Sequence, residues 1–356
     1  SLVGSEMCIR DRLYINNGNG SFIYNNSSLP DNFSSGMRVS SADFDKDGDI
    51  DLFVGGRVVP GSYPLPSESF LLENISDANG IKFKNTYESI FSFKEIGLVT
   101  SSVWTDYNND GWEDLVVVGE WTPIKFYKNM EGKFSEDTSL IDVDSTRGWW
   151  YDIISEDFDN DGDMDLVIGN LGNNYKYQAS GDETFDIFYN DFDKNNSGDI
   201  VLSYYSDGEQ YPLRGRQCSS DQIPAIKTKF QDYDAFSIAT LEDVYTEPDL
   251  ENSLHYFTKT FSSVYLENTG NSFVMNKLPV LAQLSSINKI LSSDIDKDGY
   301  KDIIVSGNMF NSEVETPRND GSVGVYLKYT PGSGFEAVST QKSGLFINGD
   351  VKDMEF

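Results

Sequence analysis

The sequence is poor in the residues that most often carry catalysis or bind soft metals. Its 356 residues include one histidine, His255, and two cysteines, Cys8 and Cys218. Two cysteines imply no disulfide framework, and soft or imidazole ligands are too few to favour zinc, copper or iron. A lone histidine between Leu254 and Tyr256 is more often a packed or surface residue than a base, and no G-x-S-x-G or H-E-x-x-H motif is present. We therefore expect no catalytic residue.

Basic residues are scarce as well. The chain has 27 Lys and Arg against 58 Asp and Glu, which gives a formal net charge of −31. Nucleic-acid binding needs patches of Lys and Arg that neutralise phosphates, so this charge argues against a nucleic-acid partner. No apolar run reaches the roughly 20 residues that a membrane-spanning helix needs. We expect no transmembrane segment.

Acidic loops of one fixed spacing are what the sequence has in abundance. Five segments begin at Asp43, Asp106, Asp157, Asp191 and Asp294, and each has Asp or Asn at positions 1, 3, 5 and 9 counted from that first residue. More than a third of all 58 carboxylates lie in these five windows. Carboxylates this crowded repel one another without a cation, and an oxygen-only ligand set suits Ca²⁺. We therefore expect up to five Ca²⁺ ions that contribute to the stability of the fold.

Each loop is expected to offer side-chain oxygens from positions 1, 3, 5 and 9 and a backbone carbonyl from position 7. A glycine at position 6 permits the sharp turn around the ion. In the fourth loop Asn196 replaces this glycine. Asparagine tolerates the left-handed conformation better than most residues, so we expect this site to be weaker. The expected ligands are Asp43, Asp45, Asp47, Asp49 and Asp51; Asp106, Asn108, Asp110, Trp112 and Asp114; Asp157, Asp159, Asp161, Asp163 and Asp165; Asp191, Asp193, Asn195, Ser197 and Asp199; and Asp294, Asp296, Asp298, Tyr300 and Asp302.

An EF-hand loop begins with the same alternation but ends differently. It needs a Glu at position 12 and a helix on each side. Position 12 here is Val54, Val117, Ile168, Leu202 or Val305. These residues belong to short apolar runs rich in Val and Ile, which are typical of buried strands. Each acidic loop is therefore expected to join two strands. An ordinary Asp/Gly turn would explain one such loop, but five matches favour metal binding.

A second repeated element lies between the acidic loops. Strand-like residues lead into a turn rich in Asn and Gly, and an aromatic residue then opens another strand, which is a hairpin pattern. The aromatic residues are Phe22, Phe83, Phe134, Phe273 and Phe335. Together with the strand–loop–strand unit, this hairpin gives four antiparallel strands per repeat. Such sheets arranged radially form a propeller. We predict an all-β propeller of about six to seven four-stranded blades.

The spacing of the loops is irregular. Only 34 residues separate Asp157 from Asp191, which predicts a shortened blade, whereas 103 residues separate Asp191 from Asp294 and contain an insertion. A helical insertion is expected at about residues 219–246. Its apolar stripe either packs on the propeller, which we favour, or belongs to a lid over a binding face.

The helical prediction rests on local spacing. Ser219 and Gln222 have the spacing of a capping box, and Ile226, Phe230 and Tyr233 recur at helical intervals. A second short helix is expected from Asp234.

Residues 1–12 differ in character from the rest and are expected to be a non-native leader. Residues 13–356 are expected to form the propeller. We expect the sequence to be a fragment of a longer chain, so the lack of a signal peptide carries no information.

The acidic loops followed by LFVGG, LVVVGEW or LVIGN resemble FG-GAP/VCBS repeats, the calcium-loop blades that also build integrin α-subunit propellers. Longer stretches, including GGRVVPGSYPLP and GNLGNNYKY, resemble bacterial VCBS-repeat proteins related to cartilage acidic protein. The resemblance covers nearly everything after Arg12. It implies an exported or cell-surface protein whose Ca²⁺ ligands are the loop residues named above. The glycine missing from the fourth loop is the one departure.

Two classes of function follow from this resemblance. The favoured one is a non-catalytic recognition, adhesion or scaffold module for a protein or glycan ligand. The alternative is a calcium-dependent polysaccharide lyase, because rhamnogalacturonan lyases also use calcium-bearing propellers. Candidate lyase residues are Tyr211, Arg214 and Arg216. Trp121, Trp149 and Trp150 are candidates for a sugar platform, although packing between blades is the favoured role for these aromatic side chains.

Overall fold

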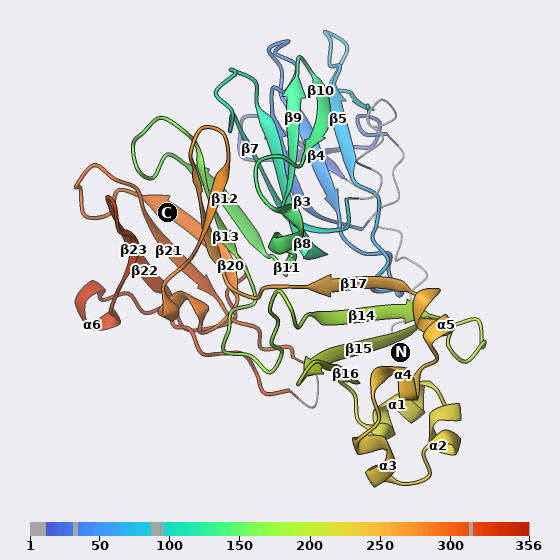
Figure 1. The fold of residues 1–356 in the computed structure, drawn as a ribbon. Coiled ribbons are helices and arrows are strands. Elements are labelled where there is room, and N and C mark those ends of the chain that lie inside the picture. Colours follow the sequence, from blue (N-terminus) through green and yellow to red (C-terminus); the bar gives the residue numbers. More distant parts are fainter. Residues whose placement is uncertain (1–11, 31–34, 87–92, 94–95, 313–315, 356) are drawn as a thin grey trace.

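The computed structural model describes residues 12–30, 35–86, 93, 96–312 and 316–355. The expected leader, residues 1–12, lies outside this part of the chain except for Arg12. The chain forms antiparallel sheets joined by long loops, with a group of short helices at one end (Figure 1). The fold is mostly β, as the sequence predicts.

Four sheets have the repeat unit that the sequence predicts, and we call them the blade-like sheets. The first contains β3 (Gly36–Ala42), β4 (Asp51–Gly56), β5 (Phe70–Asn74) and β6 (Phe83–Asn85). The second contains β7 (Leu98–Thr105), β8 (Asp114–Thr122), β9 (Lys125–Met130) and β10 (Lys133–Asp137), with β11 (Gly148–Trp149) also paired to β8. The third contains β12 (Asp152–Glu156), β13 (Asp165–Gly169), β18 (Val264–Asn268) and β19 (Phe273–Lys277). The final sheet contains β20 (Ile287–Ser293), β21 (Asp302–Gly307), β22 (Val325–Thr330) and β23 (Gly334–Val338).

The first strands of the blade-like sheets, β3, β7, β12 and β20, lie side by side in chain order. Hydroxyl pairs join them: Ser40 Oγ lies 2.8 Å from Ser102 Oγ, and Thr105 Oγ1 lies 2.8 Å from Ser155 Oγ. Asp152 on β12 accepts from Ser101 Oγ on β7 at 3.1 Å. Its other carboxylate oxygen accepts from the backbone N–H of Ile290 on β20 at 3.0 Å. One buried carboxylate therefore ties three sheets together.

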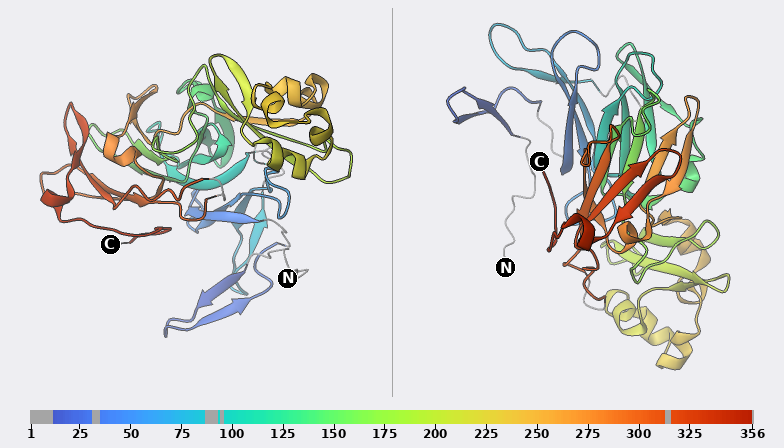
Figure 2. Two further views of the ribbon diagram at one scale, coloured as in Figure 1. Left: turned by 90° about the horizontal axis from the view of Figure 1, so that it is seen from below. Right: turned by 90° about the vertical axis from the view of Figure 1, so that its left-hand side faces the viewer.

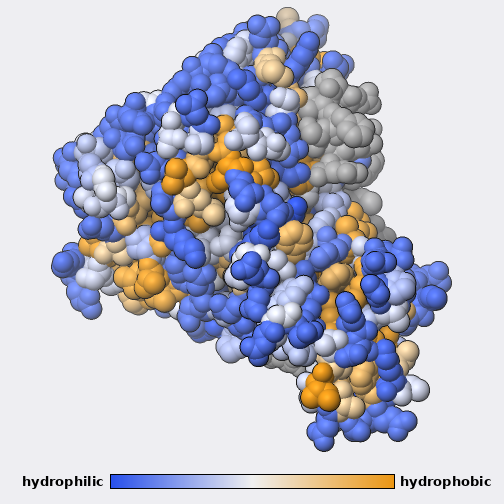
Figure 3. Space-filling model, in the orientation of Figure 1, coloured by the Kyte–Doolittle hydropathy of each residue, from blue (hydrophilic) through white to orange (hydrophobic). Residues whose placement is uncertain are grey.

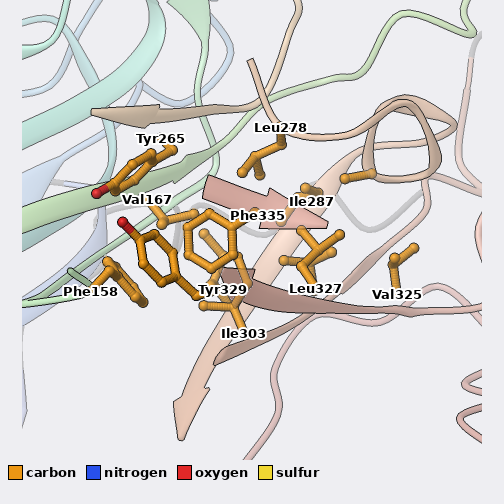
Figure 4. Close-up of a cluster of buried hydrophobic side chains, with 13 residues drawn as sticks. Phe158, Val167, Tyr265, Leu278, Ile287, Ile303, Val325, Leu327, Tyr329 and Phe335 are labelled. Atoms are coloured by element: carbon orange, nitrogen blue, oxygen red, sulfur yellow. The ribbon is translucent and has the colours of Figure 1, made fainter. Parts of the chain in front are cut away.

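Apolar side chains fill the space between consecutive blade-like sheets. Figure 4 shows the cluster between the third and final sheets, where Phe158, Val167 and Tyr265 meet Ile303 and Leu327. Equivalent clusters lie between the first and second sheets and between the second and third. Because each sheet buries one face against the next, the sheets stabilise one another by removing apolar surface from water.

The predicted count of six to seven blades is not confirmed. The described residues form five sheets of four or more strands and one two-stranded hairpin, β1 (Leu13–Asn16) with β2 (Phe22–Asn25). That hairpin stands apart from the sheets in both views of Figure 2. It leaves Tyr14, Phe22 and Ile23 half exposed or more.

The shortened blade predicted between Asp157 and Asp191 is wrong. The fourth acidic loop belongs to a complete sheet in the order β16 (Glu209–Pro212), β15 (Asp199–Ser206), β14 (Phe185–Asn190) and β17 (Leu254–Thr258), which we call the inserted sheet. This sheet lies in sequence between β13 and β18, and these two strands nevertheless pair directly with each other. The irregular spacing therefore reflects a sheet nested inside the third blade-like sheet.

The helices follow β16 and are shorter and more numerous than predicted. They are α1 (Arg216–Gln222), α2 (Ala225–Lys229), α3 (Tyr233–Ser237), α4 (Leu241–Val244) and α5 (Glu247–Glu251). Ser219 lies inside α1, whose N-cap is Gly215, so the predicted capping box does not form. The chain leaves the helical conformation at Phe230. A new helix starts after Asp232, whose side chain caps α3 by accepting from Ala235 N at 2.7 Å.

These helices pack on the inserted sheet. Ile226 and Phe236 join Phe188 of β14 and Val201 of β15 in one buried cluster. Arg216 fixes the turn after α2 by donating to the carbonyls of Phe230 at 2.6 Å and of Gln231 at 3.1 Å. The apolar side chains of the helices therefore pack, but on the inserted sheet rather than on the blade-like sheets. In the part of the chain that the structure describes, the other helical elements are α6 (Thr340–Ser343) and the 3₁₀ turns η3 (Val143–Thr146) and η4 (Val280–Gln283).

Hydrophilic side chains cover most of the face shown in Figure 3, in keeping with the charge of the chain. Within the described residues, no helix is long and apolar enough to cross a membrane.

Candidate metal centres

Every acidic loop joins the first two strands of its sheet or, in the inserted sheet, β14 to β15. Position 1 organises the loop through backbone hydrogen bonds. In the third loop Asp157 accepts from Asp161 N at 3.2 Å and from Gly162 N at 3.1 Å. The equivalent bonds form in the second, fourth and fifth loops. In the first loop Asp43 accepts only from Gly48 N, at 3.1 Å, and its other carboxylate oxygen, Oδ1, has no hydrogen-bond partner among the described residues.

The turn needs two residues in the left-handed region, and the sequence reasoning recognised only one of them. Position 6 has φ of 97° at Gly48, and Asn196 in the fourth loop reaches 66°. The asparagine thus keeps the fold of the loop, although a side chain at this φ is less favourable than glycine. Position 4 is also left-handed, in residues Lys46, Asn109, Asn160, Lys194 and Lys297. The preference for Asn or Lys at this position was visible in the sequence.

Position 9 is buried in every loop and is held mainly by the protein. Asp165, for example, accepts from Asn268 N at 2.7 Å, from Phe158 N at 3.2 Å and from the hydroxyl of Tyr265 at 2.9 Å. The equivalent residues are Asp51, Asp114, Asp199 and Asp302, all 3% exposed or less. This carboxylate links the acidic loop to the next strands of its own sheet.

Burial also changes the acidity of these groups. Loss of hydration raises the pKa of Asp51 to about 6, and it raises the pKa of Asp114 and of Asp165 to about 7. Neighbouring carboxylates add to the effect, since Asp159 faces Asp165 and Asp110 faces Asp114. A cation near these groups would favour their charged forms.

Four of the five loops bring three carboxylates together, with ligand atoms within 4.8 Å of one another. The groups are Asp43, Asp45 and Asp51; Asp157, Asp159 and Asp161; Asp191, Asp193 and Asp199; and Asp294, Asp296 and Asp302. The second loop forms no such group among the described residues. Its position 3 is Asn108, whose amide nitrogen donates to Asp114 at 2.6 Å. Loops one, three, four and five are therefore the stronger candidates for a metal ion.

The donor chemistry in the first loop fits a hard cation. One oxygen of Asp43 and one of Asp49 are buried and have no hydrogen-bond partner among the described residues. A buried carboxylate oxygen without a partner is costly, so such groups normally pair with a cation or a donor. The three residues of each of the four groups are carboxylates and offer only oxygen ligands, as Ca²⁺ prefers.

The third strand of each blade-like sheet distinguishes the sites by charge. Lys328 on β22 forms ion pairs with Asp296 and with Asp298, the latter at 2.8 Å. Lys128 on β9 lies 3.2 Å from Asp110. The residues at the same place in the first and third blade-like sheets are Glu73 and Glu267, directly before Asn74 and Asn268. An ammonium group therefore approaches the second and fifth loops. The first and third blade-like sheets have a carboxylate at the same position of the strand instead, and that of Glu73 lies 3.8 Å from Lys84.

Consecutive loops touch one another from sheet to sheet. Position 4 makes the contact: Lys46 lies over the ring of Trp112 at 4.1 Å, Asn109 donates to Gly162 O and Asp163, and Asn160 donates to Gly299 O at 3.0 Å. These contacts join the first, second, third and fifth loops in that order. The candidate metal sites of the blade-like sheets therefore lie along one continuous edge.

Position 2 anchors the loop in the apolar space next to the following sheet. Phe158 is fully buried and packs with Tyr265, Tyr329 and Phe335 at ring distances of 5.1–6.4 Å. Phe44 and Tyr107 occupy the same place in the first two loops. The aromatic residue at this position was visible in four loops of the sequence, but its role depends on the neighbouring sheet.

The tryptophans considered as a sugar platform and the single histidine make packing or pairing contacts within the protein. Trp121 and Trp150 are 1% and 0% exposed and are packed in the core, which excludes them as an open sugar platform, whereas Trp149 is half-buried. His255 Nε2 lies 2.7 Å from Asp186, and its ring stacks on Phe188 at 4.2 Å. Sequence reasoning missed this carboxylate partner, because Asp186 and His255 meet only through the pairing of β14 with β17.

Comparisons with known proteins were made for the sequence and for the structure. The family model of the FG-GAP-like repeat matches residues 6–54 and 106–168, so its first match begins within the expected leader. The structure is similar to that of the V. cholerae biofilm matrix protein Bap1, with 11% sequence identity and a TM-score of 0.24 over 88% of this chain and 70% of that chain. Likeness at this level supports no functional argument. The comparison with curated proteins gives no match. The chain therefore carries FG-GAP-like repeats, as its acidic loops predict.

Proposed function

We propose that the protein is an exported or cell-surface, calcium-binding recognition, adhesion or scaffold module without catalytic activity. In this proposal Ca²⁺ is held by the loop carboxylates and stiffens the edge that the loops form, while other surfaces bind a protein or glycan ligand. The propeller would span residues 13–356, with the inserted sheet and its helices as an addition to it.

One observation carries the proposal: carboxylates from positions 1 and 3 converge with a third carboxylate in four loops of the same backbone conformation. Bound Ca²⁺ would neutralise the repulsion within each group. It would be held by the residues of positions 1, 3, 5 and 9 and by the carbonyl of position 7. The inferred sites are strongest in the first and third loops, where Glu73 and Glu267 add negative charge, and weakest in the second.

The expected affinity supports a location outside the cell. Calcium sites of extracellular modules bind in the range of about 10⁻⁴–10⁻³ M, so they fill only where calcium is plentiful. At ten times the dissociation constant one ion stabilises the fold by about 1.4 kcal/mol. Four ions would add about 6 kcal/mol, which is comparable with the whole stability of a typical domain.

Calcium titration of chelator-treated protein tests the proposal. We expect isothermal titration calorimetry to show several sites, and we expect the double variant Asp157→Asn/Asp159→Asn to lose one of them. Asp182→Asn is the matched control, because Asp182 is exposed and lies outside the acidic loops. Absence of calcium-dependent heat in the wild-type protein, or an unchanged number of sites in the double variant, would contradict the metal assignment.

The absence of catalysis needs a separate test. Acidic polysaccharides incubated with the protein are expected to give no unsaturated products, which absorb ultraviolet light. Turnover that disappears in Arg214→Ala or Tyr211→Phe would overturn the non-catalytic proposal in favour of a lyase.

A further inference from the structure

Two loops that are far apart in the sequence enclose a polar pocket. None of the residues that line it belongs to an acidic loop. One loop follows β13 and the other connects β21 to β22. The pocket has a volume of about 570 Å³. Its lining includes Asn174, Tyr175, Gln178, Arg318 and Asp320. A volume between about 300 and 1,000 Å³ is usual for the binding site of a small molecule.

The floor of the pocket is fixed by backbone contacts. Asn173 N donates to Gln283 O at 2.8 Å, and the amide nitrogen of Asn174 donates to Leu284 O at 3.2 Å. Gly172 has φ of +88°, and a Cβ there would lie 2.7 Å from Ser285 O. A Cβ on Gly321 would lie 2.6 Å from Leu284 O. Residues 172–174 of the first loop and Gly321 of the second therefore rest closely on the segment 283–285 and are held in place without a ligand.

The walls of the pocket offer both hydrogen-bond donors and acceptors. The amide nitrogens of Asn174 and Gln178 are engaged with backbone carbonyls, Gln178 with Tyr175 O at 2.7 Å, which leaves their amide oxygens as acceptors. Arg318 uses Nε and Nη2 to bind Asp320, at 2.9 and 2.7 Å, and its remaining N–H groups are donors. Planar groups of this kind can bind two neighbouring hydroxyls at once.

A buried amide, that of Asn319, lies beneath these walls. Asn319 is 4% exposed, and its side-chain oxygen accepts from Ser285 Oγ at 2.9 Å. Its amide nitrogen is buried and has no hydrogen-bond partner among the described residues. A buried donor without a partner is unusual and is often satisfied by a bound molecule or water.

An aromatic side chain completes the lining. Tyr175 is half-buried and meets Tyr177 edge to face, with ring centroids 5.0 Å apart. Tyr177 in turn stacks on Phe185 of β14 at 4.5 Å. Tyr175 is thus held by a packed aromatic group, and it provides an apolar surface beside polar groups.

The polar groups and the tyrosine of the pocket lining fit some classes of ligand better than others. A metal ion would need several carboxylates, and Asp320 is the single carboxylate in the lining. A phosphate would need several positive charges, but the lining has two cations, Lys176 and Arg318, and the charge of Arg318 is paired with that of Asp320. An apolar molecule would cover the amide oxygens of Asn174 and Gln178 and the remaining guanidinium N–H groups of Arg318 without forming hydrogen bonds to them. A sugar ring has hydroxyls that both donate and accept, together with an apolar C–H face.

We infer that this pocket binds a pyranose unit of a carbohydrate, with Asn174, Gln178, Arg318 and Asp320 bonding its hydroxyls and Tyr175 contacting its ring. The inference deepens the proposed recognition function and rests on it. The same hydroxyl chemistry occurs in neutral sugars and in uronic acids.

Saturation-transfer NMR on the full chain in calcium tests this inference. The probes are glucose, galactose, mannose, N-acetylglucosamine, glucuronic acid and galacturonic acid, each measured alone. We expect at least one sugar to receive saturation. We also expect its affinity to fall about tenfold or more in the double variant Asn174→Ala/Arg318→Ala, because each substitution removes one hydrogen-bonding group from the pocket. Tighter binding of the uronic acids than of the neutral sugars would identify the acidic class as the ligand.

The control variant is Asn276→Ala, in a second pocket between the third and final sheets. It should leave sugar binding unchanged, and thermal melts should show that both variants are folded. Failure of all six sugars to bind, or equal binding by the double variant and the wild type, would overturn the inference.

Calcium titrations of the same samples separate this inference from the proposed function. If the protein binds calcium but no sugar, only the inferred sugar site is refuted. If the wild-type protein binds no calcium, the proposed function itself is refuted.

Discussion

Removal of calcium by a chelator should reverse the sign of the pH dependence of the free energy of unfolding. The cause is the buried carboxylate at position 9 of the acidic loops. Burial raises the pKa of Asp114 and of Asp165 to about 7 in the folded chain, compared with an ordinary value of 3.8. A group with a raised pKa in the folded state binds its proton more tightly there than in the unfolded state. The resulting stabilisation is complete below pH 4 and is lost as the pH rises through 7.

The size of the effect follows from these values. Between pH 8 and pH 6 a carboxyl with a pKa near 7 takes up most of one proton in the folded state, which corresponds to at most about 1.4 kcal/mol. Two such groups give at most about 3 kcal/mol, and Asp51, with a pKa of about 6, adds less. Solvent in the nearby loops screens part of this energy, so we expect about 1–2 kcal/mol in EDTA.

Calcium should give the opposite slope. A proton that binds to a ligand carboxylate competes with the cation, so acid releases the metal and removes its contribution to stability. Stability in millimolar CaCl₂ should therefore fall from pH 8 to pH 6, whereas stability in EDTA should rise.

Urea unfolding followed by tryptophan fluorescence at pH 6, 7 and 8 measures both slopes. Asp165→Asn should flatten the slope in EDTA, and Asp182→Asn, an exposed carboxylate, should leave it unchanged. Parallel curves with and without calcium, or a loss of stability on acidification in EDTA, would refute the reasoning.

Three substitutions test separate parts of the loops. Lys328→Gln removes the ammonium that pairs with Asp296, so calcium affinity measured by calorimetry should rise about threefold; a fall would show that Lys328 supports the site. Phe158→Ala should cost about 3–5 kcal/mol in urea unfolding because it leaves a cavity between two sheets, whereas Phe22→Ala, on the exposed hairpin, should change stability by less than about 0.5 kcal/mol. Equal effects of these two would contradict the packing role. Asn196→Gly relieves the left-handed strain and should raise the unfolding free energy by a few tenths of a kcal/mol, and a lower value would indicate that the asparagine side chain contributes to the loop.

The local parts of the fold were predictable from the sequence, because short-range spacing determines them. The alternating carboxylates identified every acidic loop. The aromatic residues after Asn- and Gly-rich turns identified the hairpin of each blade-like sheet and that of β1 with β2, but not the β15–β16 hairpin of the inserted sheet. Both signals lie within about a dozen residues. The left-handed Asn196 also follows from the known tolerance of asparagine for this conformation.

Features that depend on distant contacts could not be predicted in the same way. Pairing of β13 with β18 joins Leu166 to Leu266, and nothing near either residue marks the other. The role of Phe158 requires the neighbouring sheet, and the position of Trp121 in the core requires the packing around it. The helical spacing of Ile226 and Phe230 was real, but the chain turns at Phe230 because Arg216 binds its carbonyl there.

Nesting one sheet inside another has a consequence for the order of events during synthesis. Strand β13 emerges from the ribosome well before β18, and residues 170–263 must be made before its permanent neighbour arrives. During that interval one edge of β13 is unpaired, while the inserted sheet with its helices can already assemble from its own contacts. Early assembly of that sheet would bring the two ends of residues 170–263 close together. Strand β18 could then find β13 more quickly.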